Sequence, residues 1–281
     1  MTGGGMLLHG KRALVVGLMN KHSLAASVTQ ALLSHGAHVV VSSKSALTQS
    51  QVKACAFHGP TATSSSSDAG KGESSALPLH FRECNVESEE SISNLMELCG
   101  EIFDGQLDVL VHSIAFAPRE TFTAHGGALT ATKEAWHQAM DISAYSLIAL
   151  TRAAYPLLSS GVDGSLTRDR SILALSYAGA SKVMPNYSIM GPAKAALEAT
   201  SRQLAYELGP EGIRVNCLSP GPMNTVSARG IPGISRMRKY SEEHSPLRRN
   251  ATGSDVGNTA AFLASDLASA ITAQTIYATR C

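Results

Sequence analysis

Two residues seven positions apart, Tyr187 and Lys194, have the types and spacing best suited to chemistry in this sequence. The apolar pattern predicts that both lie on one amphipathic helix, where such residues differ by about 20° in direction and by roughly 10 Å along the axis. A tyrosine hydroxyl can donate to a developing oxyanion, and a nearby ammonium can hold a sugar diol. The same two residues could also simply occupy a helix surface, so the surrounding elements must decide.

Apolar runs with strand character alternate along the chain with stretches whose apolar residues recur every three or four positions. Such alternation is typical of βαβ units and a parallel sheet. We therefore expect one dinucleotide-binding domain over residues 1–281, an α/β fold with a single Rossmann-type doubly wound parallel sheet flanked by helices. The expected strands are 12–16, 37–41, 77–84, 107–112, 170–176, 213–218 and 271–277. The expected helices are 23–35, 88–103, 133–158, 187–208 and 254–264.

The turn after the first expected strand is suited to a nucleotide. The strand ends at Gly17, and a short turn leads to Ser23, a good helix N-cap. A glycine permits a tight turn, and the free N–H groups of the helix start can receive a pyrophosphate. Because the G-x-G-x-x-G fingerprint is absent, the turn would by itself equally fit ordinary strand–helix packing.

The end of the second expected strand bears on the adenosine ribose. A carboxylate there would bind the ribose 2′-hydroxyl, but this chain has Ser42, Ser43 and Lys44. Lys44 permits a 2′-phosphate without requiring one, and an ordinary surface lysine is the alternative.

Composition excludes several classes of function. The net charge is +1, 16% of residues are charged, and no basic stretch is interleaved with aromatics, so we expect no nucleic-acid partner. No apolar run approaches the roughly 20 residues needed to cross a bilayer, so we expect no membrane partner. The cysteines show no metal-ligand spacing, so we expect no metal and free thiols in the cytoplasm, or in an organelle matrix after removal of a transit peptide. They are Cys55, Cys84, Cys99, Cys217 and Cys281.

Residues 58–76 interrupt the pattern. The segment is rich in Ser, Gly and Ala and poor in large apolar residues. Such a composition predicts a flexible surface insertion between a helix and the next strand. A regulatory loop is the alternative.

Several segments together carry a resemblance to a known family. The main ones are 17–25 (GLMNKHSLA), 112–118 (HSIAFAP) and 175–194 (LSYAGASKVMPNYSIMGPAK). Further matches are 141–145 (DISAY), 207–216 (ELGPEGIRVN), 219–225 (SPGPMNT), 246–250 (PLRRN) and 255–258 (DVGN). The chain resembles the enoyl-acyl-carrier-protein reductases, a divergent branch of the short-chain dehydrogenase/reductases, from about residue 10 to residue 277.

The tyrosine spacing distinguishes that branch from its relatives. Ordinary members of the superfamily place a tyrosine four positions before the lysine and a serine thirteen before that tyrosine, where this chain has Met190 and Tyr177. A tyrosine seven before the lysine, with a second one ten earlier, is the enoyl reductase pattern. In an ordinary member the tyrosine hydroxyl lies beside an oxygen on the carbon that accepts the hydride. The changed spacing would place the hydroxyl beside a carbonyl two bonds further along the substrate.

The resemblance implies a reaction and roles for three catalytic residues. Hydride from NADH, with NADPH as the alternative donor, would pass to the β-carbon of a trans-2-enoyl thioester in fatty acid biosynthesis. Tyr187 would stabilise the enolate oxygen, and Lys194 would bond the nicotinamide ribose. Tyr177 would line the pocket, or serve as a structural aromatic at a strand end.

The resemblance also implies binding residues, position by position. Those for the cofactor are Gly17, Ser23, Leu24, Lys44, Asn85, Val86, Ser113, Ile114, Ala115, Leu175, Lys194, Pro222, Met223 and Thr225. Those for the substrate are Phe116, Ala117, Tyr177, Tyr187, Met190 and Met223. The methionines would equally suit a hydrophobic core.

Residues 225–246 are expected to form a mobile lid over the substrate. They show no strong helical start and contain Gly230 and Pro232. Basic residues exceed acidic ones in and just after the segment, which would suit docking of an acidic acyl carrier protein or simply form a solvated basic face. The basic residues are Arg229, Arg236, Arg238, Lys239, Arg248 and Arg249, against Glu242 and Glu243.

Four features depart from the family pattern. Ser27 replaces a small glycine of the first helix and would place a hydroxyl close to the sheet, and Pro220 replaces an alanine before the nicotinamide loop. Ala273 replaces a glycine of the last strand. The printed chain stops at Cys281, where the family continues into a tail that supports its homotetramers. We expect a homotetramer or homodimer whose assembly or activity this ending weakens.

Two other functions remain open at this level. A dinucleotide-binding protein without efficient catalysis, acting as a sensor or scaffold, would fit the altered last strand. A reductase of another small enone or carbonyl would fit the fold. The tyrosine spacing favours the enoyl-thioester reductase over both.

Overall fold

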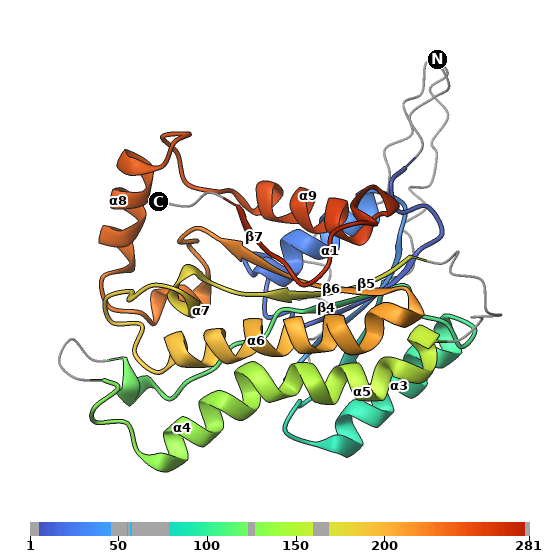
Figure 1. Ribbon diagram of the computed structural model, residues 1–281, viewed down its shortest axis with the longest axis horizontal. Coiled ribbons are helices and arrows are strands. Elements are labelled where there is room, and N and C mark those ends of the chain that lie inside the picture. The colour runs from blue at the N-terminus through green and yellow to red at the C-terminus, as the bar shows by residue number, and fades with distance from the viewer. Residues whose placement is uncertain are drawn as a thin grey trace.

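One parallel sheet organises the chain. The computed structural model describes residues 6–45, 55, 57, 79–122, 127–159 and 169–278, so the insertion expected at 58–76 lies outside the described residues. The strands are β1 (Arg12–Val16), β2 (His38–Ser43), β3 (His80–Glu83), β4 (Val109–His112), β5 (Arg170–Leu175), β6 (Ile213–Pro220) and β7 (Thr275–Ala278). All pairings are parallel, in the order β3-β2-β1-β4-β5-β6-β7 (Figure 1). The predicted doubly wound parallel sheet is confirmed.

Helices follow most of the strands. They are α1 (Leu24–Ser34), α3 (Glu89–Ile102), α4 (Lys133–Met140), α5 (Ser146–Ser159), α6 (Met190–Leu208), α7 (Val226–Arg229), α8 (Ile234–His244) and α9 (Gly253–Ala264). The helix expected over 133–158 is interrupted by a π-helix, Asp141–Tyr145. Among the described residues, no helix is both long and apolar enough to cross a bilayer.

The strands bury both faces of the sheet. Successive side chains of a strand point to opposite faces, so Leu14 and Val16 enter one hydrophobic cluster and Ala13 and Val15 the other. Helices α3, α5 and α6 contribute to the first cluster, and α1 and α9 to the second, which gives the three layers of Figure 1. The strand order reverses between β1 and β4, and ligands of doubly wound sheets bind at the carboxyl ends of the strands beside such a point.

Ser27 packs against helix α9. A Cβ on Gly253 would lie 2.4 Å from the Ser27 hydroxyl oxygen, and one on Gly257 would lie 2.5 Å from its carbonyl oxygen. The Ser27 hydroxyl therefore lies beside α9, and the expectation that it is close to the sheet stays a prediction. The glycines of α9 leave room for the α1 backbone and for this side chain.

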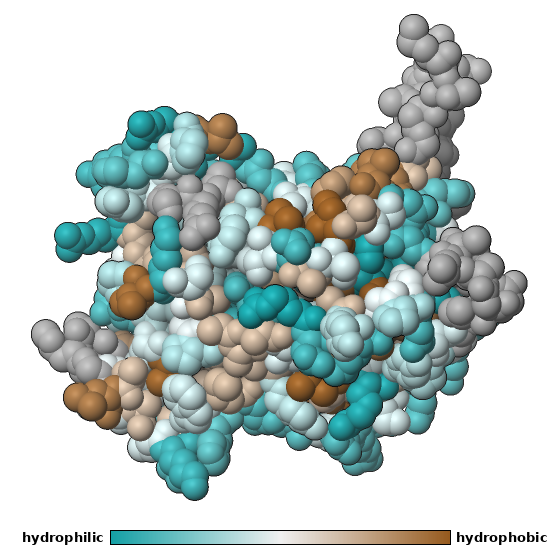
Figure 2. Space-filling model, viewed as in Figure 1, coloured by the Kyte–Doolittle hydropathy of each residue, from teal (hydrophilic) through white to brown (hydrophobic). Residues whose placement is uncertain are grey.

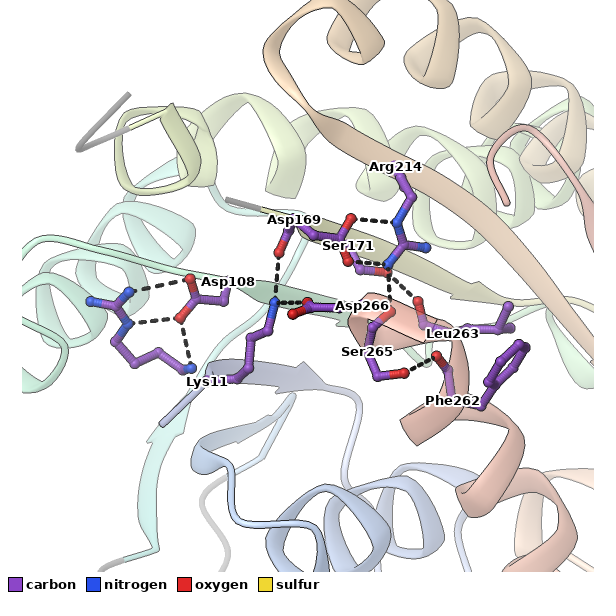
Figure 3. Close-up of polar contacts among 10 residues, drawn as sticks. Lys11, Asp108, Asp169, Ser171, Arg214, Phe262, Leu263, Ser265 and Asp266 are labelled. Atoms are coloured by element: carbon purple, nitrogen blue, oxygen red, sulfur yellow. Dashed lines mark hydrogen bonds and ion pairs between the residues drawn. The ribbon is translucent and has the colours of Figure 1, made fainter. Parts of the chain in front are cut away.

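Ion pairs tie the strands together at the amino edge of the sheet (Figure 3). Arg214 at the start of β6 donates to both carboxylate oxygens of Asp169 at 2.6 and 2.7 Å, and Lys11 donates to the Asp169 carbonyl at 2.8 Å. Arg12 on β1 donates in the same way to Asp108, before β4. Removing one partner of such a buried pair leaves the other charge uncompensated, so these contacts hold the strand starts in place.

The segment predicted to be a lid is largely helical. Thr225 caps α7 by accepting the Ala228 N–H at 3.1 Å, and Gly233 precedes α8 with a φ of +85°. The prediction that residues 225–246 lack a strong helical start is therefore wrong. Thr225 supplies a start that the weak apolar pattern of the segment concealed.

Ala273, the residue in place of a glycine, has a backbone φ of +59°. An L-residue in this left-handed region costs about 1 to 2 kcal/mol relative to the right-handed one, whereas glycine does not. We expect Ala273→Gly to raise the free energy of unfolding by about 0.5 to 1 kcal/mol, after the loss of a partly buried methyl and the added freedom of the unfolded chain. Urea unfolding followed by circular dichroism measures the change.

The matched control is Ala199→Gly at an exposed position of α6. There the same substitution should lower stability by about 1 kcal/mol, because glycine is a poor helix former. A loss of stability at both positions would show that the positive φ of Ala273 carries no strain.

Candidate active site

Lys194 is a buried ammonium bound to the carboxyl edge of the sheet. Its side chain projects from α6, the residue is 4% exposed, and Nζ donates to the carbonyls of Leu175 at 2.6 Å and Ile114 at 3.2 Å. Burial lowers its pKa to about 8, against the opposing influence of Cys217 and Glu198. The lysine therefore connects the segments at the ends of β4 and β5. Its ammonium loses its proton at a pH not far above neutral.

Tyr187 precedes α6 instead of lying on it. Asn186 and Ser188, on either side, have positive φ values of 62° and 49°, so the chain is not helical there and α6 begins at Met190. The expectation that Tyr187 and Lys194 share one helix is wrong. The position of Tyr187 is therefore set by a turn before α6 and not by the periodicity of the helix.

The two tyrosines meet edge to face. The ring centroids of Tyr177 and Tyr187 lie 4.9 Å apart with an interplanar angle of 64°. Gly179 makes room for them, because a Cβ there would lie 2.4 Å from the Tyr187 ring. Burial, with a smaller effect of Tyr177, raises the pKa of Tyr187, so its hydroxyl stays protonated and can donate.

An apolar cluster surrounds these rings. Its buried members are Ala117, Ala139, Tyr187, Ile189 and Met190, with Phe122, Ala131, Tyr177, Met184 and Ile231 packed against it. Two of the predicted substrate contacts, Ala117 and Met190, thus lie beside the tyrosines. Phe116 is 42% exposed, and Met223 packs against the hydrophobic cluster of α1 and α9, not against the cluster that contains the tyrosines. Ile231 and Phe122 were not anticipated from the sequence.

The π-helix supplies a residue that sequence reasoning missed. Ser143 accepts the Phe116 N–H at 2.9 Å and donates to the Phe116 carbonyl at 2.9 Å. This double contact fixes the backbone after β4, next to Ala117 of the apolar cluster. π-Helical turns occur often at functional sites. Residues 141–145 had carried part of the resemblance, but no residue-level signal pointed to Ser143.

His112, at the end of β4, stays neutral. It is fully buried, and burial together with nearby Lys194 lowers its pKa to about 3. Ser146 donates to the Ile142 carbonyl at 2.7 Å, so it accepts from His112 Nε2 at 2.7 Å. A histidine in this state supports the fold and is not an acid–base catalyst at neutral pH.

The turn after β1 fits a nucleotide phosphate. Gly17 has a φ of +111°, and a Cβ there would lie 2.2 Å from the Ser113 carbonyl oxygen, so only glycine fits. Ser23 caps α1 by accepting the Ala26 N–H at 3.2 Å. The N–H groups of the first turn, those of Leu24 and Ala25, have no acceptor within the helix and can face an anion. A dinucleotide therefore fits the residues present.

The other expected cofactor residues lie at the same edge. They follow the carboxyl ends of the strands: Lys44 after β2, Asn85 and Val86 after β3, Ser113, Ile114 and Ala115 after β4, Leu175 at the end of β5, and Pro222, Met223 and Thr225 after β6. Three of their side chains already have internal partners: Lys44 pairs with Glu87 at 2.6 Å, Asn85 accepts the Glu87 N–H at 3.3 Å, and the Thr225 hydroxyl caps α7. The remaining contacts with a cofactor stay predictions.

The segment with helices α7 and α8 contacts both the nucleotide turn after β1 and the region of the two tyrosines. Ser227 lies 3.5 Å from the Met19 sulfur on the nucleotide turn. The Tyr177 hydroxyl lies 3.9 Å from the Met237 sulfur on α8, and Asn186 donates to the Pro232 carbonyl at 2.8 Å. The segment therefore lies over the tyrosines and beside the phosphate turn, as a cover for the site would.

Fold and site together define a class. A doubly wound sheet with a phosphate turn after β1, a buried lysine on the switch edge and a tyrosine beside it is a Rossmann-type, dinucleotide-dependent oxidoreductase architecture. The family model for enoyl-(acyl carrier protein) reductase matches residues 17–279. The chain belongs to the enoyl-acyl-carrier-protein reductase family.

Curated relatives and solved structures agree. The NADH-dependent enoyl-acyl-carrier-protein reductase of Aquifex aeolicus is 39% identical over 96% of this chain and 90% of its own length. The Escherichia coli enzyme is 36% identical over 96% and 93%. The Aquifex aeolicus structure superposes with a TM-score of 0.83, covering 97% and 96% of the chains at 37% identity. The Bacillus cereus reductase, solved with NADP⁺ and indole naphthyridinone, gives 0.82 over 97% and 96% at 32% identity.

Proposed function

We propose that this protein reduces the trans-2 double bond of enoyl thioesters in fatty acid biosynthesis, with NADH as hydride donor. The observation that carries the proposal is Tyr187, held edge-on against Tyr177 in an apolar pocket, with the Lys194 ammonium on the adjacent sheet edge. Membership of the enoyl-acyl-carrier-protein reductase family supports it. So do relatives named as NADH-dependent enzymes.

The site residues divide the chemistry among them. The cofactor, when bound, would supply a hydride to the substrate β-carbon, and protonation of the α-carbon would complete the saturation of the double bond. Tyr187, kept protonated by its buried setting, donates a hydrogen bond to the thioester oxygen on which charge develops. Lys194 holds the ribose hydroxyls beside that tyrosine. Met190, Ile231 and the tyrosine rings exclude water from the reacting carbons.

The first test is Tyr187→Phe. We expect kcat/KM for crotonyl thioester to fall by about 10² to 10³, because the variant loses one oxyanion donor while keeping the ring. The loss of absorbance at 340 nm with NADH measures turnover, and NADH fluorescence measures binding, which should be little changed. Tyr155→Phe, at an exposed position of α5, is the matched control.

The outcome also separates the alternatives. A folded protein that binds NADH but turns over no enoyl thioester would favour the non-catalytic dinucleotide-binding protein. Turnover of a simple ketone but not of the enoyl thioester would favour a reductase of another carbonyl. Unchanged turnover in Tyr187→Phe would remove the tyrosine from the mechanism.

The pairing of Lys44 supports NADH over NADPH. Its ammonium lies 2.6 Å from the Glu87 carboxylate, which comes from the loop after β3 and is less exposed than the lysine. The ribose 2′-position of a dinucleotide lies near the end of β2 in this fold. Glu87 therefore neutralises Lys44 and places a negative charge where a 2′-phosphate would bind.

Glu87→Gln should weaken this discrimination. The freed lysine would attract a 2′-phosphate, so we expect the ratio of the Kd for NADPH to that for NADH to fall about tenfold, a change of about 1.4 kcal/mol. Fluorescence titration with both cofactors measures it. Glu90→Gln, an exposed residue at the start of α3, is the control. An unchanged ratio would mean that Glu87 plays no part in cofactor choice.

An acyl carrier protein is the proposed partner, and α8 is the proposed contact. The helix forms part of the hydrophilic surface at the upper left of Figure 2 and exposes Arg236 and Lys239. Not all the basic residues of the region are available: Arg249 is bound by Asp255 at 2.6 Å, and Arg238 is half-buried. Lys239 is only loosely paired with Glu243, at 3.8 Å, and stays 78% exposed.

Charge reversal of the two exposed residues tests the docking. In Arg236→Glu/Lys239→Glu we expect the KM for carrier-bound substrate to rise about tenfold at low salt, because opposite charges guide such encounters. The KM for the coenzyme A thioester should not change. Arg82→Glu/Lys133→Glu, which makes the same change in net charge elsewhere, is the control. Equal effects on both thioesters would contradict a carrier-specific contact.

Two further features of the function are proposals. The homotetramer or homodimer is one, and sedimentation would measure it. A cytoplasmic location is the other, and it is supported by the four free thiols among the described residues, at Cys55, Cys84, Cys99 and Cys217.

A further inference from the structure

A buried carboxylate lies one helical turn beyond Lys194. Glu198 is 8% exposed on the inner face of α6 and accepts a hydrogen bond from the Ser176 hydroxyl at 2.5 Å. Burying a carboxylate is costly unless a partner or a nearby cation compensates it. The mechanism proposed above gives this group no role, so its position needs another explanation.

Together Lys194 and Glu198 hold two successive residues of one strand end. The Lys194 ammonium binds the Leu175 carbonyl at 2.6 Å, and the Glu198 carboxylate binds the hydroxyl of the next residue, Ser176. The Ser176 N–H in turn donates to the Leu218 carbonyl of β6 at 2.8 Å. Tyr177 follows directly, so this double contact sets where the second tyrosine leaves the sheet.

Glu198 is also a counter-charge. The titratable groups that face Lys194 from the packed elements are Cys217 on β6, His112 on β4, Glu198 on its own helix, and the tyrosines at the site. Burial raises the pKa of Cys217 to about 11 and that of Tyr187 further, and His112 is neutral. Cys217 and Glu198 both raise the lysine pKa against the larger effect of burial. Because the Cys217 thiol stays protonated, Glu198 is the carboxylate among the described residues that act on the Lys194 charge.

We propose that Glu198 is a positioning residue for Lys194: its charge keeps the buried ammonium protonated, and its bond to Ser176 aligns the Leu175 carbonyl and Tyr177. The inference rests on the proposed function, in which Lys194 binds the cofactor ribose. In this proposal Glu198 contacts neither cofactor nor substrate. It acts through the lysine and through the end of β5.

The experiment is a titration of NADH binding against pH in Glu198→Gln. Glutamine keeps the size and the acceptor for Ser176 but removes the charge. The wild-type affinity should fall as pH rises through the Lys194 pKa of about 8, because the ammonium is the binding form. In the variant that fall should begin about one pH unit lower, because the neutral side chain no longer offsets burial.

Two variants act as controls. Glu207→Gln makes the same change at an exposed position of α6 and should leave the midpoint where it is in the wild type. Ser176→Ala keeps the carboxylate but removes its bond, so kcat should fall severalfold while the midpoint moves less than in Glu198→Gln. A folded Glu198→Gln protein with the wild-type midpoint would overturn the proposal.

A second variant keeps the test decisive if Glu198→Gln does not fold. Glu198→Asp retains the negative charge, but its side chain is one methylene shorter, so the carboxylate lies further from Ser176. A wild-type midpoint with weaker NADH binding would support the proposal, and unchanged binding together with an unchanged midpoint would refute it. Because NADH binding is the readout, a lack of enoyl-thioester turnover would count against the proposed function alone.

Discussion

The structure depends most on one interaction, the Lys194 ammonium on the carbonyls of Leu175 and Ile114. Leu175 ends β5 and Ile114 follows the end of the adjacent strand β4, so a cation shared between their carbonyls joins α6 to the middle of the sheet. An ammonium in a dry site tends to lose its proton unless acceptors and a negative charge compensate. The helix that carries the lysine must therefore also supply that compensation.

The tyrosines depend on this arrangement. Tyr177 leaves the sheet two residues after the carbonyl that binds Lys194, and Tyr187 packs against its edge in the room left by Gly179. Both rings face an apolar cluster, which keeps the phenol protonated, while the neighbouring His112 is kept neutral. The site thus keeps its phenolic proton on Tyr187 and its positive charge on Lys194, while His112 carries no charge.

Much of this architecture can be predicted from the sequence, and the exceptions have physical causes. Strands buried on both faces are continuous apolar runs, so Arg12–Val16 was predicted with its observed bounds. The break of the helix at 141–145 depends on Ser143 bonding Phe116, a contact between distant segments that periodicity cannot show. The position of Tyr187 outside α6 depends on two positive φ values, and sequence patterns carry little information on these for Asn186 and Ser188.

The two edges of the sheet use their polar groups differently. At the amino edge, Arg214 donates to both carboxylate oxygens of Asp169 and also to the carbonyls of Ile271 and Ser265, so these hydrogen bonds stabilise the fold. At the carboxyl edge, the helix start after Gly17 keeps N–H groups without internal acceptors, and the Lys194 ammonium meets carbonyls instead of a direct carboxylate partner. A carboxylate placed directly on that ammonium would compete with a ligand for its protons. Holding Glu198 one turn away, bonded to Ser176, supplies the charge and leaves the remaining donor capacity of the lysine for a ligand.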